Sequence, residues 1–152
     1  MTPDRVERDA AAYVDFLASR ESVSAGKLGV VGYCFTGAFA MRTAAVRPDK
    51  IAAAASFHGG GLHTAATASP HHVLPRIRAR LYFGHAVNDQ SMPAEAIEKL
   101  GRALASWGDE YHCETHDGAY HGWTTPGVPV YKEKQAARAF DKLTELFTQT
   151  LK

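Results

Sequence analysis

Gly-Tyr-Cys-Phe-Thr-Gly, residues 32–37, is the stretch that decides the fold of this chain. The apolar segment 28–31 precedes it and a helix-forming segment, 38–45, follows it, which predicts a strand, a sharp turn and a helix. Gly32 and Gly37 give the backbone room in such a turn. Cys34 occupies the apex, where the N-terminal end of the following helix favours the thiolate form. The pattern is typical of a nucleophile elbow, with cysteine where serine is more common.

An acid and then a base follow this turn along the chain, in the order that an α/β-hydrolase uses. The segment 81–89 predicts a strand that ends in a polar loop carrying Asp89. The segment 111–121 predicts another strand, followed by a glycine-containing loop that carries His121. Each of the three residues therefore falls at the C-terminal end of a predicted strand. Because a single G-x-C is weak evidence, the argument depends on finding all three in this order.

The remaining periodicity predicts strands alternating with helices. We expect strands at 27–33, 51–57, 80–84 and 111–115, helices at 3–19, 35–46, 93–108 and 131–151, and a long loop at 58–76. The first helix has Thr2 as its expected cap, Pro3 at its first position and an apolar stripe formed by Val6, Ala10, Tyr13, Val14 and Leu17. This alternation predicts a parallel sheet covered on both faces, with a ligand crevice beyond the carboxyl ends of the strands.

Four segments resemble the dienelactone hydrolase family of cysteine α/β-hydrolases. They are GYCFTG at 32–37, AAAASFHGGG at 52–61, YFGHAVNDQSMP at 82–93 and DGAYHGWTTPGVPVY at 117–131. The resemblance begins at about Lys27 and covers only the second half of the family's usual domain. It implies a single domain over 1–152 with a partial α/β-hydrolase fold: about four parallel strands flanked by helices, without the family's N-terminal strands. It also implies hydrolysis of an ester or lactone in the cytoplasm without a metal. Cys34 would be the nucleophile, His121 the base and Asp89 the carboxylate that orients it.

Two departures from the family pattern bear on activity. Thr36 stands where glycine is usual; a β-branched side chain there either crowds the turn or is tolerated because Gly37 follows. The Phe35 N–H is the expected oxyanion donor, but the second donor and a thiol-controlling glutamate belong to the family's earlier strands. The alternatives to an ester or lactone hydrolase are therefore a truncated, inactive fragment kept as an interaction module, and a redox-sensing thiol at Cys34.

The substrate pocket is expected to involve His58 and Trp123. His58 opens the sequence His-Gly-Gly-Gly at 58–61, which spells a lipase oxyanion motif but lies downstream of the elbow, so we interpret it as a wall of the crevice. Trp123 either packs against substrate or anchors the loop that carries His121. The resemblance implies that some lactone-cleaving relatives bind a substrate carboxylate with an arginine after this histidine. The segment 122–130 has no arginine or lysine, so specificity for an anionic lactone is not indicated.

Composition excludes several classes of partner. The net charge of +1 provides no field to attract nucleic acid or anionic lipid, and no apolar run approaches the length of a membrane span. The N-terminal residues lack the apolar region of a signal peptide. Two cysteines give no disulfide framework. His112, Glu114 and His116 alternate on one strand face and could suggest a metal, but no water-activating partner is evident. We expect no metal and no cofactor.

The strand before the elbow is expected to lie at a sheet edge. Without the family's earlier strands, Leu28–Tyr33 keeps its downstream neighbour and lacks an upstream one. Its sequence, LGVVGY, has no charge or proline to discourage pairing with another chain. We therefore expect a homodimer through this edge, pairing with a partner that supplies strands, or aggregation.

Overall fold

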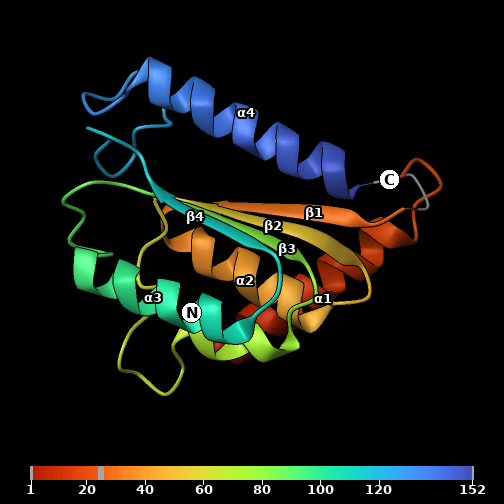
Figure 1. Ribbon diagram of the computed structural model, residues 1–152. Coiled ribbons are helices and arrows are strands. Elements are labelled where there is room, and N and C mark those ends of the chain that lie inside the picture. The colour runs from red at the N-terminus through yellow and green to blue at the C-terminus, as the bar shows by residue number, and fades with distance from the viewer. Residues whose placement is uncertain (1, 24–25, 152) are drawn as a thin grey trace.

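Four parallel strands form one sheet in the order β1-β2-β3-β4 (Figure 1). The computed structural model describes residues 2–23 and 26–151. The strands are β1 (Leu28–Tyr33), β2 (Ile51–Phe57), β3 (Arg80–His85) and β4 (Tyr111–Thr115). Tyr33 lies opposite Phe57, and Phe57 lies opposite Gly84. This register brings the carboxyl ends of neighbouring strands to one level, so the residues that follow them meet at the same edge of the sheet.

Helices cover both faces of the sheet. The helix α4 (Glu133–Thr150) lies on one face, while α1 (Pro3–Ala18), α2 (Gly37–Val46) and α3 (Ala94–Trp107) lie on the other (Figure 1). Alternate strand residues face the two layers. Ala53, Ala55, Phe57 and Tyr82 join the core under α4, whereas Ala54, Leu81 and Phe83 join the larger core with α1, α2 and α3. The predicted α/β class, with four parallel strands flanked by helices, is confirmed.

Several local expectations are wrong in detail. The elbow continues into a short 3₁₀ helix, η1 (Cys34–Thr36), so α2 begins at Gly37 rather than at residue 35. The expected long loop contains a second 3₁₀ helix, η2 (Pro70–Arg76), which forms because Val73 and Leu74 are buried in the core. The Thr2 side chain makes no capping hydrogen bond to α1.

The first helix buries a narrower stripe than its sequence predicts. Val6, Ala10 and Val14 are buried, but Tyr13 and Leu17 are 70% and 44% exposed. These two side chains line an apolar groove of about 380 Å³ between α1, β1 and α2. The groove lies next to an open edge of the sheet, because among the described residues β1 pairs with β2 alone. The predicted edge position of β1 is therefore confirmed, whereas association through it stays a prediction.

No helix in the described parts of the chain has the length and apolar character needed to cross a membrane.

Candidate active site

The elbow places Cys34 in a strained backbone conformation directly after β1. Its φ of 55° lies in the left-handed region, which is uncommon for a residue with a side chain. A Cβ on Gly32 would lie 2.1 Å from the Thr36 carbonyl oxygen, and one on Gly37 would lie 2.1 Å from Ser56 Oγ. Only glycine fits at these two positions, as the sequence predicts. Phe35 follows the thiol at the start of η1, with its side chain 64% exposed.

The threonine at the third position of η1 holds the turn instead of crowding it. The Tyr33 N–H donates to Thr36 Oγ1 at 2.8 Å, and the Thr36 hydroxyl donates to the Tyr33 carbonyl at 2.6 Å. One side chain thereby pairs both backbone groups of the residue before the nucleophile candidate. Of the two expectations for Thr36, tolerance fits the structure, because the γ-oxygen points back to the strand end and makes hydrogen bonds there.

The structure brings together the three residues that the chain order singles out. His121 Nε2 lies 3.1 Å from Cys34 Sγ, and His121 Nδ1 lies 2.7 Å from Asp89 Oδ2. The imidazole therefore bridges a thiol and a carboxylate that are far apart in sequence. The Asp89 side chain is 4% exposed and that of His121 is 34% exposed, so the carboxylate is shielded while the imidazole remains accessible. Such a chain of contacts can move a proton between sulfur and imidazole while the carboxylate fixes the ring.

Asp89 is held by a serine that the sequence analysis missed. Asp89 Oδ1 accepts hydrogen bonds from the Ser91 N–H at 2.8 Å and the Ser91 hydroxyl at 2.7 Å. The carboxylate of an aspartate in a turn often accepts the N–H of the residue two positions on, as in an Asx turn, so the position of Ser91 could have indicated this contact. Burial raises the pKa of Asp89, but the hydrogen bonds from Ser91 and His121 outweigh it, so the pKa lies below its usual value. The neighbouring Asn88 is exposed and does not compete for the orienting role.

The charge state of His121 is set by opposing effects. Burial lowers the pKa of the imidazole. The hydrogen bonds to Asp89 and Cys34, together with the negative charge near the ring, raise the pKa by more than burial lowers it. The net effect is a pKa above the usual value for histidine. A raised pKa makes the imidazole a stronger acceptor for the thiol proton.

The two residues expected to line the substrate pocket are buried instead. His58 is 3% exposed and Trp123 is fully buried, and their rings contact each other with centroids 5.0 Å apart. Trp123 also packs against His116, which directly follows β4. Register and loop packing turn both rings inward, and contact of either ring with substrate stays a prediction. For Trp123 the geometry fits the alternative, in which it anchors the loop carrying His121.

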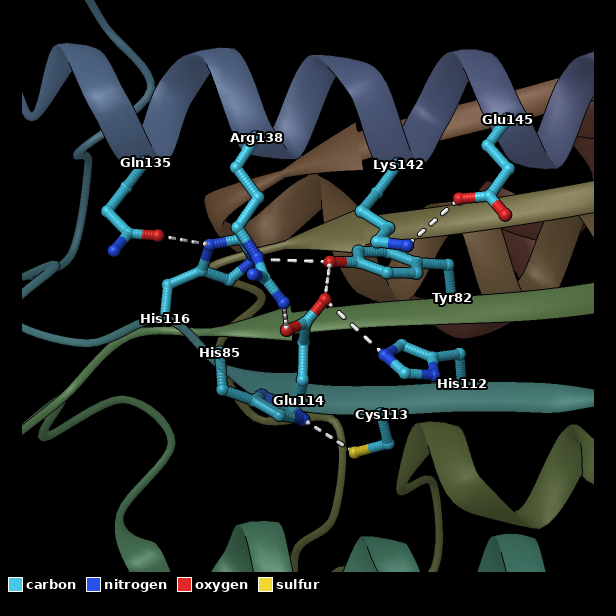
Figure 2. A network of polar contacts seen from close by, with 10 residues as sticks. All are labelled: Tyr82, His85, His112, Cys113, Glu114, His116, Gln135, Arg138, Lys142 and Glu145. Carbon is cyan, nitrogen blue, oxygen red and sulfur yellow. Dashed lines mark hydrogen bonds and ion pairs between the residues drawn. The ribbon is translucent and has the colours of Figure 1, made fainter.

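The alternating face of β4 is occupied by internal contacts (Figure 2). Glu114 accepts the Tyr82 hydroxyl hydrogen bond at 2.8 Å and pairs with Arg138 of α4. His116 Nδ1 lies 3.0 Å from Gln135 Oε1. No group of three or more histidine, cysteine, aspartate or glutamate side chains that could hold a metal ion occurs within the described residues. These side chains join β4 to α4 and so fix the base of the loop that carries His121.

Comparison with known proteins gives consistent results. The model of the "Dienelactone hydrolase family" matches residues 1–151. A "Putative carboxymethylenebutenolidase" from Synechocystis sp. is 29% identical over 147 residues, which are 95% of this chain and 59% of that protein. The crystal structure of a "Putative Dienelactone Hydrolase" from Klebsiella pneumoniae superposes with a TM-score of 0.86 at 20% identity, covering 97% of this chain and 62% of that one.

A second solved structure, the "Dienelactone Hydrolase-like Promiscuous Phospotriesterase P91" from metagenomic libraries, superposes with a TM-score of 0.80 at 22% identity and again covers 97% of this chain and 62% of the other. At these identities the two structural matches show the fold, which is that of an α/β-hydrolase. The chain thus spans about three-fifths of the length of the relatives and structures that it matches.

Proposed function

The chain belongs to the dienelactone hydrolase family, and from this membership and its site geometry we propose that it hydrolyses a carboxylic ester or lactone through a Cys34-His121-Asp89 triad. One observation carries the proposal. His121 lies within hydrogen-bond distance of both the Cys34 thiol and the Asp89 carboxylate, at a strained elbow at the carboxyl edge of the sheet. This is the arrangement that an activated nucleophile requires.

In the first half of the reaction, Cys34 attacks the carbonyl carbon of the substrate. His121 takes the thiol proton, and the thiolate forms a bond to the carbonyl carbon while the carbonyl oxygen becomes an oxyanion. The intermediate collapses, the bond to the leaving alcohol breaks, and His121 returns its proton to that alcohol. The product of this half is a thioester on Cys34.

In the second half, water hydrolyses the thioester. His121 removes a proton from water, and the resulting hydroxide adds to the thioester carbonyl carbon. Collapse breaks the carbon–sulfur bond and releases the carboxylic acid, and His121 returns its proton to the Cys34 sulfur, which restores the thiol and its hydrogen bond with the imidazole. Asp89 holds the ring so that Nε2 faces sulfur in both halves, and it stabilises the imidazolium that forms.

The oxyanion and the substrate class follow from the surroundings of the thiol. The backbone N–H of Phe35, directly after Cys34, is the proposed donor to the oxyanion; in a serine hydrolase the loss of one such donor costs about 10² to 10³ in kcat. No arginine or lysine occurs between residues 122 and 130, so we propose a substrate without a carboxylate near the scissile bond. No cofactor takes part in the proposed chemistry.

The test is hydrolysis of p-nitrophenyl acetate by the purified chain. We expect Cys34→Ala and His121→Ala each to abolish the activity, because the members of a triad act as a unit. Cys34→Ser should retain little, since an alkoxide is far harder to form than a thiolate. Mass spectrometry of rapidly quenched wild-type protein should find an acetyl group on Cys34. Activity that survives Cys34→Ala would place the chemistry elsewhere in the molecule and refute the proposal.

Assembly and location are part of the proposal. In the described parts of the chain β1 pairs on one side only, and its residues Val31 and Tyr33 are 36% and 40% exposed, next to the apolar groove along α1. We expect a homodimer through this edge, and light scattering at micromolar concentration tests it: a stable monomer would contradict the expectation. The family resemblance alone supports action in the cytoplasm.

A further inference from the structure

His58 lies at the point where the nucleophile and the base meet, although the proposed reaction gives it no role. It follows β2 directly, as Cys34 follows β1, and the strand register places the two residues side by side. The Cys34 N–H donates to His58 Nδ1 at 3.2 Å. The His58 ring also contacts the His121 ring edge to face, with centroids 5.0 Å apart. One side chain therefore touches the backbone of the nucleophile and the ring of the base.

The hydrogen bonds of His58 define its tautomer. Because Nδ1 accepts the Cys34 N–H, it carries no proton, so the proton of the neutral ring is on Nε2. Nε2 lies 2.9 Å from Thr124 Oγ1 and donates to it. The backbone φ of His58 is 39°, so His58, like Cys34, lies in the left-handed region. Both ring nitrogens and the backbone conformation are thus committed to this arrangement.

The surroundings of His58 favour the neutral ring. Burial, and then the positive charge of His121, lower the pKa of His58 to about 4. A proton on Nδ1 would face the Cys34 N–H and break the hydrogen bond between them. His58 is therefore poorly suited to act as a second base, and its geometry serves a different purpose.

We propose that His58 is a positioning residue that holds the Cys34 elbow through the Cys34 N–H and fixes the ring of His121 beside the thiol. The proposal rests on the function proposed above. The Cys34 backbone is strained, so it needs a partner that keeps it in the left-handed region. An acceptor on the Cys34 N–H supplies that constraint, and the ring contact sets the distance between sulfur and imidazole. A displacement of about 1 Å at such a site can cost about 10²-fold in rate.

Two amide variants separate the acceptor from the ring. The side-chain amide of His58→Asn reaches about as far as Nδ1, and asparagine tolerates a positive φ. The amide of His58→Gln reaches about as far as Nε2 and leaves the Cys34 N–H without its acceptor. Both variants lose the ring contact with His121, and they differ in the hydrogen-bond partner that they keep: the Cys34 N–H in His58→Asn and Thr124 Oγ1 in His58→Gln.

We expect His58→Gln to lower kcat for p-nitrophenyl acetate about 10- to 100-fold, with KM changed less than about threefold. The kcat of His58→Asn should be at least about fivefold higher than that of His58→Gln. The rate at which iodoacetamide labels Cys34 should follow the same order: wild type, His58→Asn, His58→Gln. Labelling reports on the thiol without any hydrolysis. If the wild type fails to hydrolyse esters but labelling keeps this order, the proposed function fails and the role of His58 stands.

Equal kcat and equal labelling in the two variants would overturn the positioning role, as would wild-type kinetics in His58→Gln. Nitrogen NMR of the wild-type imidazoles provides a measurement that does not depend on the variants folding. We expect His58 to carry its proton on Nε2 and to remain neutral between pH 5 and 8. A proton on Nδ1, or a titration with a midpoint near the ordinary value of about 6.5, would overturn the proposal.

Discussion

The molecule contains two cysteine–histidine pairs of almost the same length. Cys34 Sγ lies 3.1 Å from His121 Nε2, and Cys113 Sγ lies 3.3 Å from His85 Nε2. The second pair lies between β3 and β4, beneath the Glu114 network (Figure 2). Judged by distance alone, either pair could activate a thiol.

Their surroundings make the two pairs opposite in character. Asp89 accepts from Nδ1 of His121, whereas His85 Nδ1 is buried and finds no hydrogen-bond partner within the described residues. Burial raises the pKa of the Cys113 thiol to about 11 and lowers that of His85 to about 4. Both members of the second pair are therefore held neutral. A cysteine next to a histidine becomes a candidate nucleophile only where a carboxylate and access to solvent stabilise the charged forms.

The largest expected effect comes from making the first pair resemble the second. Asp89→Asn removes the carboxylate and places an amide N–H against His121 Nδ1, which favours the tautomer with its proton on Nε2. That proton faces sulfur, so the ring can no longer accept from the thiol. We expect kcat for p-nitrophenyl acetate to fall about 10³- to 10⁴-fold. Asp117→Asn, an exposed acid in the loop that carries His121, should stay within about twofold and serves as the control.

Thiol labelling compares the two pairs directly. With a pKa of about 11, only about one Cys113 side chain in 10⁴ is a thiolate at pH 7. We expect iodoacetamide to label Cys34 at least about 10²-fold faster than Cys113, as measured by peptide mass spectrometry. The Cys34→Ala chain gives the Cys113 rate alone. Similar rates at the two cysteines would remove the basis of the comparison.

The two histidines should respond to pH in opposite directions. The pKa of His85 is lowered in the folded state, so its neutral form contributes stability above pH 6.5 that is lost as the pH falls through about 4. The pKa of His121 is raised in the folded state. Its contribution to stability is therefore present below the pKa that it has in the unfolded chain, and it is lost as the pH rises through the pKa that it has in the folded chain.

We therefore expect the free energy of unfolding of the wild type to fall by about 1–3 kcal/mol more than that of His85→Leu when the pH is lowered from 7 to 4.5. Urea denaturation of both chains at the two pH values measures this difference. His58 titrates in the same range in both chains, so its contribution cancels in the comparison. An identical pH dependence in the two chains would show that His85 is not held neutral by burial.

The smallest effect is expected at the serine that supports the carboxylate. Ser91→Ala removes one of the two hydrogen bonds that Ser91 donates to Asp89 and leaves the backbone one in place. The pKa of Asp89 should rise and kcat should fall about three- to tenfold, since a hydrogen bond to a charged group contributes about 1.5–3 kcal/mol and part of it is retained. Ser91→Thr keeps the hydroxyl and should restore the rate; a Ser91→Ala variant with wild-type kcat would exclude the support role.

The sequence pattern predicted which three residues converge at the candidate site, but it did not predict how their neighbours are oriented. Cys34, Asp89 and His121 could be named because each follows a strand and parallel strands end at one edge. Pattern gave no comparable signal for His58 and Trp123, whose inward orientation depends on strand register and on the packing of a loop. Thr36 looked obstructive because a residue type indicates size, whereas the direction of its hydroxyl depends on the turn.

By itself, the sequence determined the order of strands and helices, the glycines of the elbow and the three residues that meet there, because these follow from periodicity, chain order and the space that a turn requires. The tertiary structure decided that the second cysteine also lies beside a histidine, and that this histidine has no carboxylate partner in the part of the chain that the structure describes. Cys34 and Cys113 each lie about 3 Å from an imidazole, but the imidazole beside Cys34 is held by Asp89 and partly exposed, whereas the one beside Cys113 is buried. Charge stability depends on the full set of groups around an atom, and residues from several distant segments supply that set only when the chain is folded.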